Sequence, residues 1–286
     1  MTRLLCALFA IVFANPNGVF IDGKRVTNDK LAIVPSDAWS PDGRQIAFLA
    51  ARPGDERMAS LPMHFPLYVM DANGNARRLL DIPVLPDIRW SPDGTSILFR
   101  SGDALFVADA TSGRYRRLAQ CISSASWSPD GKRIVFGAPD GIHVIDADGS
   151  QLTPLSHLGM RERNPVWSPD GKRIAFVAQG WFVMDANGDN KKRMSKLTPL
   201  RVDWSPDSRR LLVSGGGGAY VVDADGANSH SLPTGYGPIL DPLFSRDGRR
   251  VIFRTRQKLY SVNPDGSDLR TIDDRFGGNS GFAVSP

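Results

Sequence analysis

Short apolar segments alternate with polar turns along most of the chain. A typical segment, such as residues 134–136 (Ile-Val-Phe), is rich in β-branched and aromatic residues and is bounded by Gly, Pro or Asp. Segments of four to six residues with this composition are typical of β-strands. No stretch sustains the helical spacing of apolar residues over three turns. The pattern therefore predicts an all-β protein of many short strands.

One five-residue motif, Trp-Ser-Pro-Asp-Gly, punctuates these strands at regular intervals. Its full and weaker copies begin at Trp39, Trp90, Trp127, Trp167, Trp204 and Phe244, and a seventh begins at Val284. The motif serines are 51, 37, 40, 37, 40 and 40 residues apart. A fixed period of this size indicates a repeat architecture in which each unit packs on its neighbours.

Each repeat is predicted to contain four antiparallel strands, A to D. The motif aromatic lies on strand A, residues such as 134–136 form strand B and residues such as 142–145 form strand C. An Asp-Ala-Asx-Gly turn such as 146–149 then leads to a basic and apolar strand D. In the motif, Pro suits the second position of a type I turn, Asp the third and Gly the fourth, so the chain reverses between strands A and B. Four-stranded sheets that are apolar on both faces stack as β-propeller blades, with the motif aromatic between neighbours.

The motif, the Ile-Ala-Phe run at 46–48 and the Tyr-Val-Met-Asp-Ala run at 68–72 resemble the WD40-like repeat of TolB-like proteins. The resemblance covers residues 18–286 and concerns only the propeller of TolB. It implies six to seven four-stranded blades, with strand A at a central channel and strand D at the rim. The propellers that accompany prolyl oligopeptidase-type and tricorn-type proteases are similar as well.

Residues 1–14 allow two interpretations. Met-Thr-Arg, an apolar run over 4–13 and Ala14 are typical of a signal peptide, which would make the protein periplasmic or secreted. Residues 11–18 also match residues 134–141, which predicts a strand B and would fit a cytoplasmic protein. In that case the N-terminus completes a blade whose strand A is residues 282–286, and seven blades result. Residues 15–286 form a single propeller domain in both interpretations.

Composition narrows the partners that we expect. The 35 basic and 30 acidic residues are interleaved, so the net charge of +5 predicts a solvated surface rather than nucleic-acid binding. Paired basic residues follow many turn glycines, as in Lys132-Arg133 and Lys172-Arg173, and are expected to form part of that solvated face. No apolar run is long enough for a transmembrane helix, and the two cysteines suggest neither a disulfide framework nor a zinc site.

The sequence offers no convincing catalytic, metal or cofactor motif. Residues 185–190 resemble the start of an EF-hand, but Asn190 and Lys196 stand where Gly and Glu are required, so a simple turn is expected. Ser280 lacks the helix that a nucleophile elbow needs, and His143 is expected to be a packed strand residue. We therefore expect a non-catalytic, monomeric scaffold that binds a protein or a cell-envelope component. The alternative is a propeller domain or fragment of an enzyme, either a serine peptidase of the prolyl oligopeptidase type or a propeller lyase.

Binding is expected on the face that carries the B–C and D–A loops, because these loops differ from repeat to repeat. The first repeat has an insertion at 52–66, the segment 160–164 precedes the fourth motif, and polar residues stand three positions before the motif aromatics. The candidate residues are Asp55, Arg57, Met63, His64, Phe65, Asp87, Arg161, Arg163, Asn164, Arg201 and Asp241.

Overall fold

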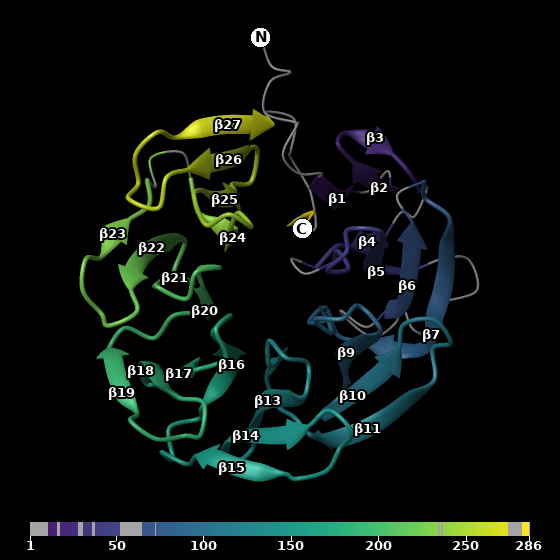
Figure 1. Ribbon diagram of the computed structural model, residues 1–286. Helices are drawn as coiled ribbons and strands as arrows, with labels where there is room; N and C mark the ends of the chain where they lie inside the picture. Colours follow the sequence, from purple (N-terminus) through teal and green to yellow (C-terminus); the bar gives the residue numbers. More distant parts are fainter. Residues whose placement is uncertain are drawn as a thin grey trace. The chain divides into compact units, whose positions relative to one another are not determined.

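A computed structural model describes residues 11–15, 18–27, 31–35, 38–51, 65–71, 73–233, 235, 237–273 and 282–285. Every regular element in these residues is a β-strand (Figure 1). The strands form seven sheets, each of four antiparallel strands. The all-β prediction is therefore confirmed, and the number of blades is seven: the fold is a seven-bladed β-propeller.

The chain divides into two compact units, and unit 1 comprises Met1–Arg117 with Gly278–Pro286. Its first sheet has the order β28 (Phe282–Val284), β1 (Ile11–Asn15), β2 (Gly18–Ile21) and β3 (Lys24–Arg25). Its second sheet contains β4 (Leu31–Ile33), β5 (Gln45–Ala51), β6 (Phe65–Asp71) and β7 (Ala76–Val84). The third contains β8 (Arg89–Trp90), β9 (Ser96–Ser101), β10 (Ala104–Asp109) and β11 (Tyr115–Gln120), whose residues run across the unit boundary.

Unit 2, Leu118–Gly277, contains four sheets that follow one another along the chain. The first two are β12 (Ala125–Trp127), β13 (Arg133–Ala138), β14 (Gly141–Asp146), β15 (Thr153–Ser156), and then β16 (Arg163–Trp167), β17 (Arg173–Ala178), β18 (Gly180–Asp185), β19 (Lys192–Ser195). The other two are β20 (Arg201–Trp204), β21 (Arg210–Gly215), β22 (Gly218–Asp223), β23 (His230–Ser231), and then β24 (Leu240–Phe244), β25 (Val251–Arg254), β26 (Leu259–Val262), β27 (Arg270–Asp273).

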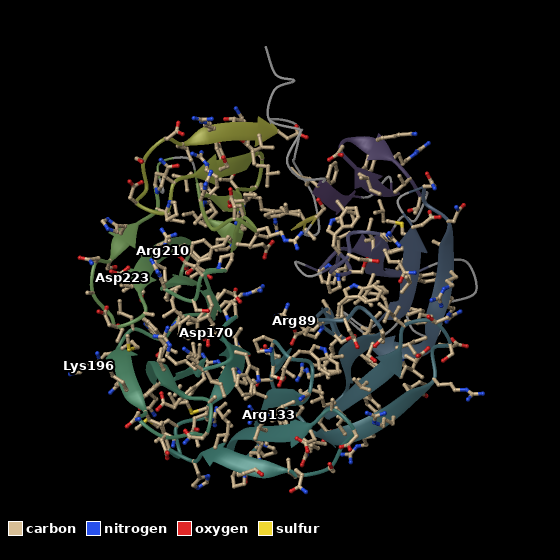
Figure 2. All side chains as sticks on the ribbon, viewed as in Figure 1. Arg89, Arg133, Asp170, Lys196, Arg210 and Asp223 are labelled. Atoms are coloured by element: carbon tan, nitrogen blue, oxygen red, sulfur yellow. The ribbon has the colours of Figure 1, made fainter. Side chains whose placement is uncertain are left out.

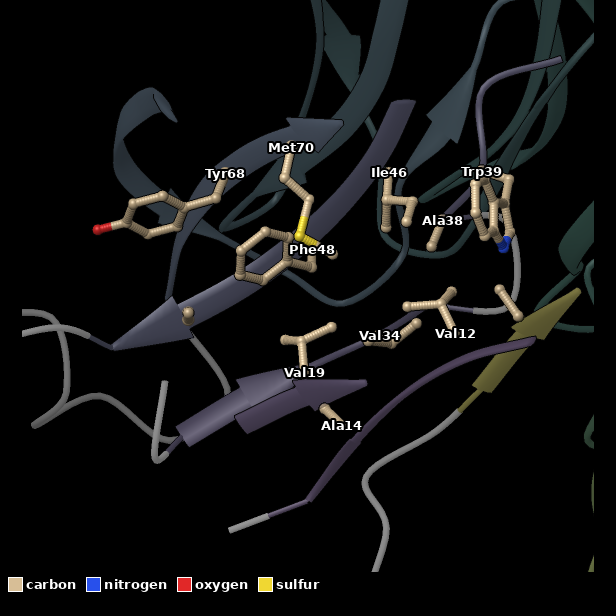
Figure 3. Packing of buried hydrophobic residues seen from close by; sticks show 12 residues of the cluster. Val12, Ala14, Val19, Val34, Ala38, Trp39, Ile46, Phe48, Tyr68 and Met70 are labelled. Atoms are coloured by element: carbon tan, nitrogen blue, oxygen red, sulfur yellow. The ribbon is translucent and has the colours of Figure 1, made fainter. Parts of the chain in front are cut away.

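The first sheet of unit 1 joins the two ends of the sequence. Ile11 pairs with Val284 and Phe13 pairs with Phe282, so β28 supplies the strand A that β1 to β3 lack. Figure 3 shows Val12 of β1 in a buried cluster with residues of the neighbouring sheet, including Phe48 of β5. Ile11–Asn15 is therefore a strand, as the internal match to residues 134–141 predicts.

Each A–B turn is held by a buried serine of the motif. In the fourth motif the Gly171 N–H donates to the Ser168 carbonyl oxygen at 2.9 Å, which is the predicted four-residue turn. The Ser168 hydroxyl donates to Asp170 Oδ1 at 2.6 Å and accepts the Arg173 N–H at 2.9 Å. The Asp170 carboxylate in turn accepts the Lys172 N–H at 3.1 Å. The same serine–aspartate pair recurs in all six copies of the motif.

Two motif tryptophans link successive sheets through hydrogen bonds of their indole nitrogens. Trp90 Nε1 donates to the Ala38 carbonyl oxygen at 2.9 Å, and Trp204 Nε1 donates to the Val166 carbonyl oxygen at 3.2 Å. Both rings are buried in clusters that contain residues of the preceding sheet, which confirms their predicted role between blades.

The prediction that both residues of the basic pairs are solvated is wrong for two pairs of unit 2. The Arg133 guanidinium lies 5.0 Å from the centre of the Trp167 ring of the next sheet, and Arg173 lies 4.8 Å from that of Trp204. The second basic residue of these pairs therefore forms a cation–π contact that holds two sheets together. The first residue of each pair, such as Lys132, is the exposed one.

Two strands of unit 2 begin at a glycine that no other residue can replace without strain. Gly141 and Gly180 open β14 and β18 with φ of 148° and 113°, and a β-carbon on either would overlap the carbonyl oxygen of Ser156 or Ser195. These carbonyl groups belong to the end of the neighbouring strand, so the close approach sets where the pairing ends.

Replacing Gly141 by alanine is expected to lower the free energy of unfolding by roughly 2–4 kcal/mol, because it adds a backbone clash to an unfavourable φ. Gly235→Ala is the control, since a β-carbon there meets nothing within 4 Å. The control is expected to change stability by less than about 0.5 kcal/mol in urea unfolding. Equal midpoints for the two variants would contradict the close approach at Gly141.

The motif aspartates make the fold sensitive to acid. The Ser40 hydroxyl and then the Arg44 N–H lower the pKa of Asp42 below its ordinary value of 3.8, and Ser245 and the Arg249 N–H do the same for Asp247. A carboxylate whose folded pKa is lowered stabilises the protein fully above the unfolded pKa and loses this effect as the pH falls through the folded pKa. The contribution is therefore present above about pH 5 and is lost progressively below it.

We expect Asp42→Asn/Asp247→Asn to reduce the dependence of stability on pH. Asparagine keeps an oxygen acceptor for the turn but cannot titrate, so the variant should lose less stability than the parent between about pH 5 and pH 2. Urea unfolding across this range measures the effect. Identical pH slopes for parent and variant would show that the two turn carboxylates do not contribute.

Candidate functional site

The loops of unit 2 lie at two opposite ends of its sheets. Strands A to D are antiparallel in every sheet, so the A–B and C–D turns lie at one end and the B–C and D–A loops at the other. Three successive D–A loops of unit 2 precede β12, β16 and β20. They differ in length and sequence, whereas the A–B turns repeat one motif.

Asn164 connects these three loops. Its Oδ1 accepts the Ser124 hydroxyl at 3.2 Å, and its Nδ2 donates to the Leu200 carbonyl oxygen at 3.0 Å. Its backbone N–H donates to Ser123 Oγ at 3.2 Å. Asn164 of β16 thus connects the loop before β12 and the loop before β20 to the loop before β16. The Asn164 surface comprises residues 121–124, 157–164 and 196–201.

The backbone around Asn164 has an unusual conformation. Arg161 and Asn164 have φ of 52° and 51°, and the pairing of β16 with β17 shifts register between Arg163 and Val166. Asparagine tolerates this left-handed region better than most residues, whereas arginine does so at a cost of roughly 1–2 kcal/mol. Bulges of this kind redirect side chains at the ends of strands and are frequent near functional sites. Arg163 and Asn164 therefore belong to β16 rather than to the loop before it.

Large apolar side chains are exposed on the Asn164 surface. Leu197 and Leu200 are 73% and 71% exposed, and Ile122 is 49% exposed. The loop that carries the leucines is nevertheless well anchored, because the Leu200 N–H donates to the Ser214 carbonyl oxygen at 2.8 Å and Pro199 is buried. Two exposed leucines three positions apart on an anchored loop are typical of an interaction surface.

Glu162 lies beneath this surface and is only 2% exposed. Its Oε1 accepts the Leu158 N–H, which closes the loop between them. Its Oε2 has no hydrogen-bond partner among the described residues. Glu162 therefore contributes structure to the loop and does not present a carboxylate to solvent.

The accessible charge of the Asn164 surface is positive. Arg201 pairs with Asp203, whereas Arg161 is exposed and its side chain makes no hydrogen bond or ion pair with any described residue. Exposed Lys196 and half-buried Arg163 likewise make no side-chain hydrogen bond or ion pair with a described residue. Figure 2 shows the Lys196 side chain beyond the end of β19, directed away from the sheets of unit 2. Arg161, Asn164 and Arg201 are candidate binding residues from the sequence, and all three belong to the Asn164 surface.

The remaining candidate residues lie elsewhere. Asp241 is at a bulge in β24, has φ of 47° and pairs with Arg254 at 2.7 Å. Asp87 of unit 1 has an oxygen 3.5 Å from Arg89. The insertion residues Asp55, Arg57, Met63 and His64 lie outside the described residues.

Phe65 corrects one expectation. The sequence places it among the candidate binding residues of the insertion, but it is the first residue of β6, pairs with Val84 and packs partly buried against a core cluster. The sheet extends one pair further than the repeat pattern suggests, because burying a phenyl ring is favourable wherever a strand partner is available.

His143 and the turn at residues 185–190 have the structural roles that the sequence predicts, a packed strand residue and a simple turn. His143 Nε2 lies 2.9 Å from Asp140 Oδ1, and its ring packs beside Phe136 in β13. In the EF-hand-like turn, Asn190 Nδ2 donates to Asp185 Oδ2 at 2.6 Å, so the turn itself engages that carboxylate. The described residues contain no group of three or more His, Cys, Asp or Glu side chains placed to hold a metal ion.

Sequence reasoning missed the apolar part of the surface. Leu197 and Leu200 stand in the sequence Lys-Leu-Thr-Pro-Leu-Arg, in which leucine beside a strand suggests burial. The available signal was their place in the loop between the end of strand D and the fifth motif, because loops of this kind lie at the surface.

Comparison with solved structures identifies the class of fold. TolB from Acinetobacter baumannii is similar with a TM-score of 0.62 and 22% identity, over 88% of this chain and 68% of that chain. A putative TolB from Agrobacterium tumefaciens has a TM-score of 0.55 and 18% identity, over 97% of each chain. A chain of a mitotic checkpoint complex reaches a TM-score of 0.63 with 17% identity, over 87% of this chain and 84% of that chain. The TolB-like propeller fold is thus confirmed, but it is shared by proteins of different roles.

Comparison of sequences adds a short match. No protein-family model matches the sequence. A segment of 62 residues is 47% identical to the uncharacterized peptidase YuxL of Bacillus subtilis (strain 168). The match spans 21% of this chain and 8% of that protein. In the part of the chain that the structure describes, no helix is long and apolar enough to cross a membrane.

Asn164→Ala is expected to lower the free energy of unfolding by about 1–3 kcal/mol, because both side-chain hydrogen bonds are lost and alanine disfavours φ of 51°. Asn164→Gly loses the same bonds but accepts the backbone, so it should be about 1 kcal/mol more stable than the alanine variant. Urea unfolding gives both values, and hydrogen exchange should show faster exchange at Leu200. Equal stability of the two variants would contradict the strained backbone.

Proposed function

We propose that this protein is a non-catalytic TolB-like β-propeller that binds another protein through the Asn164 surface. The observation that carries the proposal is the pair Leu197 and Leu200, which stay exposed although their loop is fixed by backbone and Asn164 hydrogen bonds. Exposed aliphatic groups on a rigid loop lose little entropy on association, so they favour binding to a complementary surface.

We infer that binding takes place in the cell envelope and that the protein acts as a monomeric propeller. The resemblance of the motif to TolB-like repeats supports this location, whereas residues 11–13 of the apolar run expected in a signal peptide lie in strand β1. The insertion at 52–66, with Asp55, Arg57, Met63 and His64, would provide a second contact on unit 1.

A second candidate function is a propeller domain of a peptidase. The segment that matches a protein named as a peptidase favours it. In that case Leu197 and Leu200 would contact a further domain of the same polypeptide. Immunoblotting of the native protein in its host separates the two, because the scaffold should migrate near 31.2 kDa or slightly below and the peptidase well above it.

Leu197→Ser/Leu200→Ser is expected to abolish capture of the envelope partner from a detergent extract, because the contact surface loses its apolar side chains. Leu152→Ser is the matched control: Leu152 is 56% exposed but lies beside the C–D turn, at the opposite end of its sheet. Quantitative mass spectrometry of captured proteins measures the difference. Thermal unfolding of all variants should agree within a few degrees, since none of the three leucines is buried.

The proposal fails if the same proteins are captured by the parent and by Leu197→Ser/Leu200→Ser. It also fails if Leu152→Ser loses them to the same extent, because the interaction would then not be localised to the Asn164 surface.

A further inference from the structure

We propose that the partner presents an acidic segment of polypeptide, whose carboxylates pair with Arg161, Arg163 and Lys196 and whose aliphatic side chains pack on Leu197 and Leu200. This inference rests on the proposed function and specifies the chemistry of its partner. It follows from the charge balance, the backbone strain and the side-chain composition of the Asn164 surface.

The charge balance of the Asn164 surface is one-sided. Its residues include four basic side chains and a single acidic one, Glu162, which is buried. Arg201 is already paired with Asp203. Three cations are left without any ion pair to described residues: Arg161 and Arg163 in the segment 157–164, and Lys196 in the segment that carries the leucines. A carboxylate-rich partner complements this field, whereas a basic partner would be repelled.

The conformation of Arg161 points in the same direction. Its φ of 52° would suit glycine, yet the position carries a long cation with an exposed side chain. Since the side chain makes no hydrogen bond or ion pair with a described residue that would offset the backbone cost, we expect it to bind a group of the partner. A guanidinium offers two parallel N–H donors that match the two oxygens of a carboxylate.

The composition of the surface favours a polypeptide over other anions. Residues 121–124, 157–164 and 196–201 contain no Phe, Tyr or Trp. Single-stranded nucleic acid is usually held by aromatic stacking, which this surface cannot provide, and binding to anionic vesicles distinguishes a membrane surface, which leucines and lysines could also contact. Leu197 and Leu200, separated by Thr198 and buried Pro199, instead offer two apolar contacts on which the aliphatic side chains of an extended peptide can pack.

The test uses the full chain and a fluorescein-labelled peptide of Glu-Asp-Leu repeats, with fluorescence anisotropy as the readout. The parent protein should bind this peptide and should not bind a peptide of Lys-Arg-Leu repeats. Arg161→Gly and Lys196→Gln are expected to weaken binding by about threefold each and about tenfold together. Raising the salt from about 0.05 M to about 0.5 M should weaken binding further, because these charges are exposed.

Two controls separate loss of charge from loss of structure. Arg249→Gln removes an exposed arginine from an A–B turn, at the opposite end of its sheet, and should leave binding unchanged. Arg161→Gly should be at least as stable as the parent in urea, because glycine accepts φ of 52° without strain. Weakened binding by a protein that is equally stable therefore reports the charge itself.

Several results would overturn the inference. Absence of binding to the acidic peptide, equal binding to the basic peptide, or an equal effect of Arg249→Gln would each do so. Tighter association with phosphatidylglycerol vesicles than with the peptide, lost in Arg161→Gly, would assign the surface to lipid. If Leu197→Ser/Leu200→Ser loses the envelope partner but Arg161→Gly/Lys196→Gln retains it fully, the acidic partner is wrong and the proposed function stands.

Discussion

The interaction on which the rest of the structure depends is the buried serine of each A–B turn. Its hydroxyl donates to the aspartate two residues later and accepts the N–H of the residue that opens strand B, as Ser168 does with Asp170 and Arg173. In the six sheets that contain the motif, this fixes the first pair of the sheet and therefore the register of every residue beyond it. A shift by one residue would turn the apolar side chains of strands B and C to the wrong face.

Because one end of each sheet in unit 2 is held in this way, the loops at the other end are free to vary. The B–C and D–A loops of unit 2 need only bridge fixed strand ends, and Asn164 shows how three of them become one surface. Its left-handed backbone and the bulge in β16 are departures from the regular blade, and they place an amide side chain between two neighbouring loops. The regular turns thus carry stability while the irregular ends carry the residues available for recognition.

The fold could be predicted from the sequence because it is encoded locally and repeatedly. Pro, Asp and Gly of the motif each satisfy a turn position, and Ile11 to Phe13 could be matched to residues 134–136 of a clear repeat. The surface was harder, since Leu200 is exposed only because Asn164 and Ser214 hold its backbone from other strands. Likewise, the sequence predicts a solvated side chain for Arg133, because its contact with the Trp167 ring depends on how the next sheet packs. These contacts join residues 14 to 36 positions apart and leave no trace in a short sequence window.

The central claim is that the Asn164 surface, and not the motif turns, meets the partner protein. Site-specific photo-crosslinking in the native host tests it most directly, with benzoylphenylalanine placed at Leu200 in one strain and at Leu152 in another. The account predicts a covalent adduct of defined mass from position 200 and none from position 152, since the two exposed positions lie at opposite ends of the sheets. An adduct from position 152 alone, or from both positions equally, would contradict it.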